Sequence, residues 1–437
     1  MKVLMFGWEF PPHISGGLGT ASYGLTKGIA QQDVEVLFVM PKASGDEDTS
    51  IANIINASEI TMPSLITSTD EFWKNVNFMP IDSVLIPYMG IEEYDTIKKE
   101  FTESQTRHFI HLGGKYTFSG KYGTNLMEEV GRYAWIASKI AQEQEFDIIH
   151  AHDWLTYLAG IIAKRISGKP LVVHVHATEF DRSGENINRT VYNLEKEGME
   201  QADAVITVSN LTKKTVVRRY GIDPKKVITI HNAVDFSGKE SVEETKDTAE
   251  PKLHQEKIIT FLGRITFQKG PEYFIEAASK VLKVYPNVRF VMAGNGDMMH
   301  KMIRRVSQLH MGTKFTFTGF LAGDDVNRMY SESDVYVMPS VSEPFGISPL
   351  EAMRTGVPVI ISEQSGVAEV LKNAIKVNFW DIDALADSMY GLLAYPALSK
   401  NLSEKGMREV NSLNWYDSAR LVKNLYQNVL NQKLLIN

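Results

Sequence analysis

The sequence has 437 residues, and its 43% hydrophobic and 23% charged content is ordinary for a globular protein. A chain of this length usually forms two or three domains. Its net charge of −7 indicates no basic face, so nucleic acid is a poor match as a partner. The absence of cysteine excludes a disulfide framework and a zinc site built on thiolates.

The first ten residues, MKVLMFGWEF, contain a short apolar run that Glu9 interrupts. A signal peptide would need a longer apolar stretch and a cleavage site of small residues. No segment approaches the roughly 20 apolar residues that span a bilayer. We therefore expect a cytoplasmic protein without a transmembrane segment.

Short apolar runs alternate with helical patterns along the chain. Continuous runs of this kind are typical of strands buried on both faces of a parallel sheet, and the alternation predicts βαβ units. The predicted strands are 3–6, 34–39, 148–150, 171–175, 204–208, 227–230, 258–262, 288–292, 315–318, 335–338 and 357–361. The predicted helices include 23–31, 155–166, 272–284, 384–394 and 415–430.

A charged segment, FSGKESVEETKDTAEPKLHQE at 236–256, separates the two series of strands. It is nearly free of large apolar side chains and contains a proline, which is typical of a linker. We predict an α/β protein of two Rossmann-like, doubly wound domains, and we interpret the less regular stretch 60–125 as an elaboration of the first. The predicted parts are domain 1–237, linker 238–256, domain 257–410 and a C-terminal helix within 411–437.

A glycine-rich turn, HISGGLG at 13–19, follows the first predicted strand and precedes a helix. Gly16 and Gly17 would let the backbone approach an anionic ligand at the helix N-terminus. The turn differs from the GxGxxG pattern of dinucleotide sites, and a tight turn without a ligand is the alternative interpretation.

The segment GRITFQKG at 263–270 follows the first strand of the second domain. Ligands of open α/β sheets bind at the carboxyl ends of strands. Arg264 and Lys269 could therefore clamp a diphosphate. Two solvated cations on a loop are the alternative.

The segment PSVSEPFGISPLEA at 339–352 also follows a predicted strand. Glu343 lies on its loop and Glu351 in the helix that follows, and a carboxylate can accept hydrogen bonds from two vicinal hydroxyls of a sugar or a ribose. Glutamates at this spacing also occur on solvated helices. The amide groups expected to point outward at the start of this helix belong to Gly346, Ile347 and Ser348.

Two His-x-His pairs, at 150–152 and 174–176, end predicted strands of the first domain. We expect the two members of a pair to lie on opposite sides of the strand, one facing a ligand and the other packed. Such a pair seldom binds one metal ion. A site completed by Glu179 or Asp181 is a less favoured alternative, and we predict no metal.

The motifs HAHDW, HATE, GRITFQKG, AGNGDM and EPFGISPLEAM occur in the order and spacing of GT-B glycosyltransferases. Over nearly its whole length the sequence resembles the group that contains glycogen and starch synthases, sucrose synthases and family 4 retaining transferases. The resemblance implies two Rossmann-like domains that face a deep cleft, and a C-terminal helix that crosses back toward the first domain.

By this resemblance, Arg264 and Lys269 bind the donor diphosphate, Glu343 contacts the donor sugar and Glu351 contacts the ribose. His176 matches the histidine that contacts the transferred sugar, so the implied catalytic residues are His176, Arg264, Lys269 and Glu343. The other implied donor-site positions are Gly16, Gly17, Gly294, Gly346, Ile347 and Ser348, and the acceptor-side positions are Asp153 and Trp154.

The resemblance implies transfer of an α-glucosyl unit, with retention, from ADP-glucose or UDP-glucose to the non-reducing end of an α-1,4-glucan, without a cofactor. Three positions depart from the synthase pattern: Ile14 replaces a lysine, Thr20 replaces an aspartate, and Glu351 follows family 4. One alternative is therefore a family 4 transferase of cell-surface polysaccharide or small-glycoside synthesis. Others are a sugar-nucleotide epimerase, a phosphorylase and a sugar-nucleotide-binding protein without catalysis. The donor base, the acceptor and the oligomeric state are left open.

Overall fold

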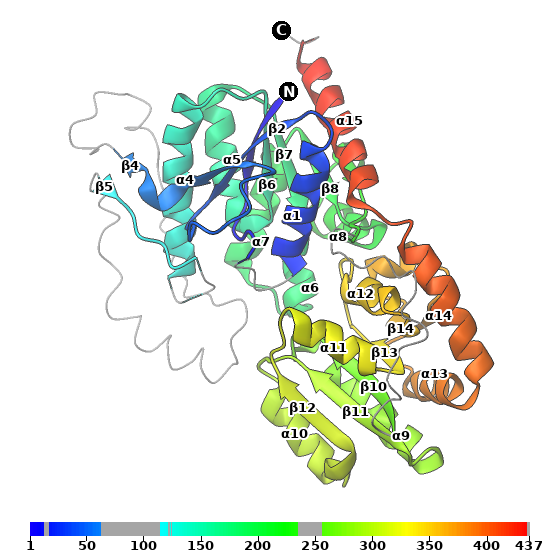
Figure 1. Ribbon diagram of the computed structural model, residues 1–437. Helices are drawn as coiled ribbons and strands as arrows, with labels where there is room; N and C mark the ends of the chain where they lie inside the picture. Colours follow the sequence, from blue (N-terminus) through cyan, green and yellow to red (C-terminus); the bar gives the residue numbers. More distant parts are fainter. Residues whose placement is uncertain (13–16, 63–113, 121–122, 124, 235–255, 435–437) are drawn as a thin grey trace, which may run out of the picture.

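The computed structural model describes residues 1–12, 17–62, 114–120, 123, 125–234 and 256–434. Two parallel sheets, each flanked by helices, account for most of these residues (Figure 1). The two-sheet architecture confirms the predicted α/β fold class. All but the last residue of the predicted linker, and most of the stretch 60–125, lie outside the described residues, so the predicted domain limits stay predictions.

Within the described residues, the first sheet has seven strands in the spatial order β3-β2-β1-β6-β7-β8-β9, and every neighbouring pair is parallel. Its strands are β1 (Lys2–Phe6), β2 (Glu35–Met40), β3 (Asn53–Asn56), β6 (Ile148–His152), β7 (Leu171–Val175), β8 (Ala204–Thr207) and β9 (Val227–Thr229). The strand order reverses between β1 and β6, and ligands bind beside such a switch point at the carboxyl ends of strands. A separate antiparallel pair joins β4 (Thr61–Met62) to β5 (Gly114–Lys115).

Helices cover both faces of the first sheet. The helices are α1 (Gly17–Ala30), α4 (Leu126–Glu143), α5 (Trp154–Ser167), α6 (Glu179–Ser183), α7 (Arg189–Gln201) and α8 (Asn210–Tyr220). Along β1, Leu4 and Phe6 pack with α4 and α5, while Val3 and Met5 pack with α1. Strand β1 is therefore buried on both faces, as its continuous apolar run predicts.

The second sheet has the spatial order β12-β11-β10-β13-β14-β15 and is also parallel. Its strands are β10 (Lys257–Leu262), β11 (Val288–Ala293), β12 (Phe315–Gly319), β13 (Val335–Met338), β14 (Val359–Ser362) and β15 (Ile375–Val377). Its helices are α9 (Pro271–Val284), α10 (Met299–Gln308), α11 (Asp324–Glu332), α12 (Ser348–Arg354), α13 (Ile382–Ala394) and α14 (Pro396–Val410). One face packs against α9, α10 and α13, and the other against α11, α12 and α14. Here the strand order reverses between β10 and β13.

Short 3-10 helices lie in the loops of both halves. They are η1 (Ala57–Glu59), η2 (Pro224–Lys226), η3 (Phe267–Lys269), η4 (Gly312–Lys314) and η5 (Gly366–Glu369). Two of them, η3 and η5, lie in the second half where it contacts the helices α6 and α8 of the first.

The C-terminal helix α15 (Trp415–Leu434) follows α14 and packs on α1 of the first half (Figure 1, red beside blue). Its Trp415 lies against two glycines of α1: a Cβ atom added at Gly24 would come within 2.2 Å of the indole nitrogen, and one at Gly28 within 2.6 Å of the Trp415 carbonyl oxygen. The glycines thus permit the close approach of the two helices. This arrangement confirms that the C-terminal helix crosses back to the first domain. Among the helices that the structure describes, none combines the length and the apolar content needed to cross a membrane.

Candidate active site

The predicted site residues of both halves cluster at the carboxyl ends of parallel strands, where open α/β sheets bind ligands. In the first half, Asp153 follows β6 and His176 follows β7. In the second half, the corresponding residues are Arg264 and Lys269 after β10, Gly294 after β11, and Glu343 after β13. Gly17 begins α1, while Gly16 lies outside the described residues.

Lys269 and Glu343 form an ion pair between the loops that follow β10 and β13. Glu343 is only 6% exposed, and its Oε2 atom also accepts a hydrogen bond from Ser340 Oγ at 3.3 Å. Its backbone is fixed as well, because its amide donates to the Gln364 carbonyl and its carbonyl accepts from the Gly366 amide. The structure thus brings together two residues that lie 74 positions apart in the sequence.

Glycines with positive φ let these loops approach each other. A Cβ atom at Gly270 (φ 65°) would lie 2.1 Å from the Pro339 carbonyl oxygen, and one at Gly294 (φ 133°) would lie 1.9 Å from the Gly263 carbonyl oxygen. Larger side chains at these two positions would therefore push the candidate site apart. Gly346 also has positive φ, at 99°.

Glu351 lies in the first turn of α12, and its Oε2 atom accepts a hydrogen bond from the Tyr330 hydroxyl at 3.3 Å. Burial raises the pKa of Glu351, and the Tyr330 hydroxyl and Arg354 oppose that rise. Glu351 is thus partly enclosed, and the alternative of a fully solvated helix face does not describe it.

Arg264 lies between β10 and η3 and is partly exposed. Burial raises the pKa of Asp297, and hydrogen bonds from the amides of Asp297 and Met298, together with the positive charge of Arg264, oppose this rise. Asp297 follows Gly294 in the predicted AGNGDM motif. Sequence reasoning had assigned no role to Asp297.

The structure overturns our expectation for the two His-x-His pairs. Residues i and i+2 of a strand share a face, because the side-chain period is two. His150 and His152 accordingly stack, with ring centroids 4.4 Å apart, and His174 and His176 stack at 4.3 Å. The expectation of opposite sides was wrong. His176 is partly exposed and the other three are buried, so His176 is the member that a ligand could contact.

Asp153 is buried, and it holds the loop that carries His176. Its Oδ1 atom accepts hydrogen bonds from the amides of His176, at 2.8 Å, and Ala177, at 3.3 Å. Its backbone has φ 60° and ψ 168°, a strained conformation for a residue with a side chain. Burial raises the pKa of Asp153 to about 6. These contacts favour a positioning role for Asp153.

Trp154, the second residue predicted to lie on the acceptor side, is 3% exposed and packs in the core between the first sheet and α5. This placement favours a packing role over contact with an acceptor.

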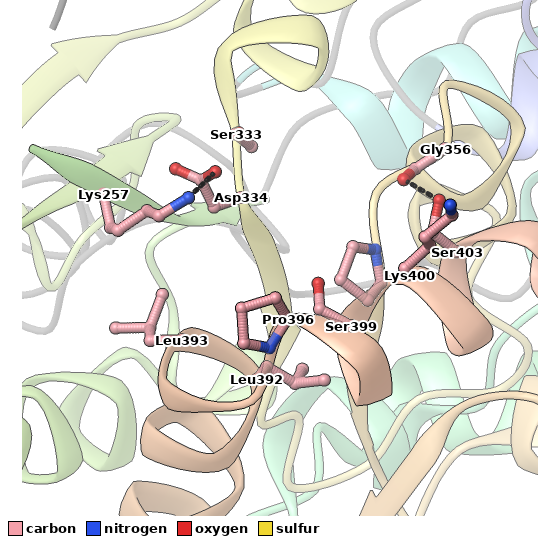
Figure 2. A pocket seen from close by; sticks show the side chains of 11 residues that line it. Lys257, Ser333, Asp334, Gly356, Leu392, Leu393, Pro396, Ser399, Lys400 and Ser403 are labelled. Carbon is pink, nitrogen blue, oxygen red and sulfur yellow. Dashed lines mark hydrogen bonds and ion pairs between the residues drawn. The ribbon is translucent and has the colours of Figure 1, made fainter. Parts of the chain in front are cut away.

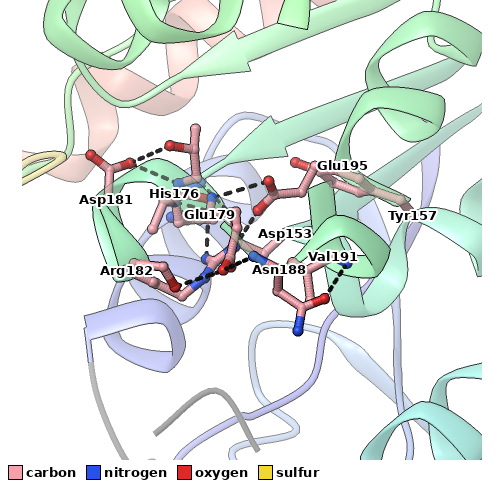
Figure 3. Close-up of polar contacts among 12 residues, drawn as sticks. Asp153, Tyr157, His176, Glu179, Asp181, Arg182, Asn188, Val191 and Glu195 are labelled. Carbon is pink, nitrogen blue, oxygen red and sulfur yellow. Dashed lines mark hydrogen bonds and ion pairs between the residues drawn. The ribbon is translucent and has the colours of Figure 1, made fainter. Parts of the chain in front are cut away.

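A buried ionic network holds α6, the short helix next to His176 (Figure 3). Arg182 pairs with both Glu179 and Glu195, and all three side chains are nearly inaccessible. Glu179 Oε1 also accepts from Ser183 Oγ and from the Asn188 amide. Burial raises the pKa of Glu195 to about 7, against the opposing charge of Arg182. Because such networks specify one geometry, this one fixes the loop of His176.

The two halves contact each other through Ser342 and Asp181. Ser342 Oγ donates to Asp181 Oδ1 at 2.5 Å. The other oxygen, Asp181 Oδ2, accepts from the amide and hydroxyl of Thr178, which completes a capping box at the start of α6. The T-x-x-D pattern signals that cap in the sequence. Its partner Ser342 lies 161 residues away, and no local pattern could reveal it.

A second contact between the halves involves Glu369 of η5. Its carboxylate accepts from the Asn210 and Leu211 amides at the N-terminus of α8, and from His231 Nε2 at 2.9 Å. An acidic side chain from one half therefore caps a helix of the other, which favours one relative placement.

Two hollows in the described part of the chain lie elsewhere. One of about 290 Å³ lies at the amino ends of the second sheet, where Lys257 pairs with Asp334 at 3.1 Å (Figure 2). Another, of about 460 Å³, lies between the second sheet and α11. Neither is lined by the predicted donor-site residues.

Comparisons with known proteins agree with this architecture. Residues 242–409 match the family model described as glycosyl transferases group 1, and residues 102–237 match glycosyltransferase family 4. The chain belongs to the GT-B glycosyltransferases of family 4. In this glycosyltransferase, residues 242–409 contain Arg264, Lys269, Glu343 and Glu351, and residues 102–237 contain His176.

Two relatives and one solved structure match nearly the full length of this chain. An uncharacterised glycosyltransferase of Methanocaldococcus jannaschii is 28% identical over 425 residues, covering 94% of this chain and 91% of the relative. Glycogen synthase of Mycobacterium tuberculosis is 24% identical over 435 residues, covering 98% and 94%. The structure of sucrose-phosphate synthase from Thermosynechococcus elongatus superposes with a TM-score of 0.72 at 19% identity, covering 99% of this chain and all of that one. At this identity the likeness shows the fold alone.

Proposed function

We propose that the protein transfers an α-glucosyl unit, with retention, from ADP-glucose or UDP-glucose to the non-reducing end of an α-1,4-glucan. The observation that carries the proposal is the Lys269–Glu343 pair at the carboxyl edge of the second sheet. It places a cation for a diphosphate beside a carboxylate that can accept from sugar hydroxyls.

The donor diphosphate gains negative charge as the glycosidic bond breaks. Arg264 and Lys269 would stabilise that charge, together with the amides of Gly346, Ile347 and Ser348 at the start of α12. In this assignment Glu351 accepts from the ribose hydroxyls. The donor is thus bound along the carboxyl ends of β10 and β13.

The acceptor hydroxyl attacks the anomeric carbon from the face that the diphosphate leaves. The bond from this carbon to the diphosphate oxygen breaks, the bond to the acceptor oxygen forms, and a phosphate oxygen takes the acceptor's proton. The configuration is thereby retained without a protein nucleophile. His176 would contact the transferred sugar, and Asp153 would hold the His176 loop in place through the two amides that it binds.

The choice of a glucan acceptor draws support from the full-length similarity to glycogen synthase. A second candidate is transfer to a cell-surface glycan or a small acceptor. It is favoured by Glu351 and by Ile14 and Thr20, the three positions that depart from the synthase pattern.

Nucleotide release from a panel of nucleotide sugars, measured with and without glycogen, tests the proposal. We expect release from ADP-glucose or UDP-glucose that glycogen stimulates and that Lys269→Ala lowers on the order of 10²–10³-fold. The exposed Lys301 supplies the matched control, because Lys301→Ala removes the same charge from the outer face of the second half. Release that glycogen leaves unchanged, but a lipid-linked or small glycan stimulates, would favour the second candidate. No release from any donor would contradict both.

A further inference from the structure

Four histidine rings form a stack inside the first domain, which we call the histidine ladder: His150 and His152 of β6, His174 of β7, and His176 after it. Neighbouring ring centroids lie 4.3 to 5.4 Å apart. His150, His152 and His174 are at most 2% exposed, and buried imidazole nitrogens of all three have no hydrogen-bond partner. Imidazoles are seldom gathered in this way without a reason, because each unpaired buried nitrogen costs free energy.

Hydrogen bonds at two points anchor the ladder. At its inner end, the hydroxyl of Tyr426 on α15 bonds to His150 Nδ1. At its outer end, His152 Nδ1 and His176 Nε2 lie 2.9 Å apart. The partly exposed His176, which the proposed function places at the donor sugar, is thus held through one of its two nitrogens, and Nδ1 is the nitrogen left for a ligand.

A metal site does not fit the ring geometry. One nitrogen from each of His150, His152 and His174 lies within 4.8 Å of the others. A zinc ion needs nitrogens about 2.0–2.1 Å away whose lone pairs converge on it. The lone pairs lie in the ring planes, and the three ring planes are within 9° to 22° of parallel. The lone pairs of the three rings therefore lie in nearly parallel planes and do not converge on one metal ion.

The proton positions follow from burial. Burial lowers the pKa of His150 and His176 to about 3 and that of His152 and His174 well below the ordinary value, so all four rings are neutral near pH 7. A neutral imidazole has one N–H and one bare nitrogen. Between His152 Nδ1 and His176 Nε2, one atom therefore donates and the other accepts.

The unpaired Nε2 of His152 decides which one donates. If His152 accepted at Nδ1, its proton would sit on Nε2 as a buried N–H without an acceptor, whereas donation from Nδ1 leaves only a bare nitrogen at that place. His152 therefore donates from Nδ1, His176 accepts at Nε2, and the proton of His176 is on Nδ1. The hydrogen bond at one nitrogen sets the tautomer at the other.

We propose that His152 is a positioning residue that fixes His176 as the Nδ1–H tautomer, so that His176 offers a hydrogen-bond donor to the transferred sugar. The contact with the sugar rests on the proposed function. The tautomer itself does not, and it can be measured without any substrate.

Nitrogen-15 NMR of imidazole-labelled protein tests the proposal, with the His176 signals assigned by their loss in His176→Asn. We expect a protonated Nδ1 and a bare Nε2 on His176 in the wild-type protein. In His152→Leu we expect a mixture of both tautomers. In His152→Asn, whose side-chain amide can occupy the place of Nδ1, we expect the wild-type tautomer.

Activity gives the second readout. His152→Leu should lower kcat about tenfold with little change in donor KM, as loss of one hydrogen bond made in the transition state predicts. His152→Asn should restore most of it. Tyr426→Phe is the matched control, since it removes a buried hydrogen bond of the ladder away from His176 and should leave the tautomer of His176 unchanged. If His152→Leu does not fold, His152→Gln takes its place as the test variant. The glutamine amide falls at the place of Nε2 of His152, so it does not replace the donor at Nδ1.

Three results would overturn the proposal. They are a wild-type His176 protonated on Nε2, an unchanged tautomer in both His152→Leu and His152→Gln, and one equivalent of tightly bound metal in the purified protein that His150→Ala removes. If no variant and no wild-type protein turns over a nucleotide sugar, the proposed function fails, while the NMR result still decides the role of His152.

Discussion

Ser342 of the second domain donates a hydrogen bond to Asp181 of the first, with 2.5 Å between Oγ and Oδ1. Ser342 directly precedes Glu343, the carboxylate that we assign to the donor sugar. Asp181 caps the helix α6, which begins three residues after His176. One hydrogen bond therefore joins the two loops that would contact the transferred sugar.

We expect Ser342→Ala to lower kcat about tenfold while changing nucleoside diphosphate affinity little, since a hydrogen bond to a charged group contributes about 1.5–3 kcal/mol. A double-mutant cycle with Asp181→Ala checks the mechanism. The effect of Ser342→Ala should shrink to less than about twofold in the Asp181→Ala background. Effects that simply multiply would show that the two residues act independently.

Glu351 and Glu343 should respond differently to the same change. Glu351→Gln should weaken the nucleoside diphosphate and the full sugar nucleotide by a similar factor, about tenfold, because both ligands carry the ribose. Glu343→Gln should spare the diphosphate and weaken only the sugar-bearing donor. Calorimetry of each variant with both ligands measures this.

Glu363→Gln supplies the control for that pair, because Glu363 is exposed at the carboxyl end of the neighbouring strand β14. It should bind both ligands like the wild type. A Glu351→Gln variant that also binds both ligands unchanged would remove the assignment of Glu351 to the ribose.

Lys269→Ala and Arg264→Ala should each cut turnover on the order of 10²–10³-fold, by analogy with the loss of one oxyanion donor, and should weaken the free nucleoside far less. Lys269→Ala also leaves the buried Glu343 without its cation. Adding Glu343→Gln to Lys269→Ala should therefore recover thermal stability without recovering turnover. Steady-state kinetics and thermal unfolding separate these effects. Turnover close to wild type in either single variant would contradict the diphosphate assignment.

The buried carboxyl of Asp153 makes stability depend on pH. Burial raises its folded-state pKa to about 6 from an ordinary 3.8, so the folded protein binds the proton more tightly than the unfolded chain. Its contribution to the unfolding free energy is therefore greatest at low pH, falls as pH rises from about 4 to 6, and stays reduced above that range. Asp153→Asn keeps an Oδ1 acceptor for the two amides and removes this titration.

We expect the Tm of Asp153→Asn, relative to wild type, to be higher at pH 7.5 than at pH 4.5, by the equivalent of about 2 kcal/mol. Calorimetry at both pH values measures it. The positive charge of Arg182 and the amides of His176 and Ala177 oppose the rise in the pKa of Asp153. A Tm difference that does not change with pH would mean that they keep the Asp153 carboxylate charged throughout.

The sequence was sufficient to predict both sheets because their central strands are continuous apolar runs, as in Val335–Met338. It did not predict β3 (Asn53–Asn56) or β15 (Ile375–Val377), since both are short, partly exposed and carry polar residues. The loops with Lys269 and Glu343 were recognisable because their residue types and strand-end positions suit a diphosphate sugar.

The remaining parts of the site depend on contacts between distant segments. The bond from Ser342 to Asp181, and that from Tyr426 to His150, join elements that no local pattern connects. The histidine ladder could have been predicted in part, because i and i+2 share a strand face and β6 pairs with β7. The stacking of rings across the two strands could be predicted only with the register in which β6 pairs with β7.

The most direct test of the central claim is the structure of the product. The wild-type enzyme should be incubated with ADP-glucose or UDP-glucose carrying carbon-13 in the glucose, and with a maltooligosaccharide, and the new linkage read by NMR. We predict one labelled α-1,4-linked glucose at the non-reducing end, formed in step with nucleotide release and formed far more slowly with Lys269→Ala. A β-linked product, or nucleotide release that yields only free glucose, would contradict the account.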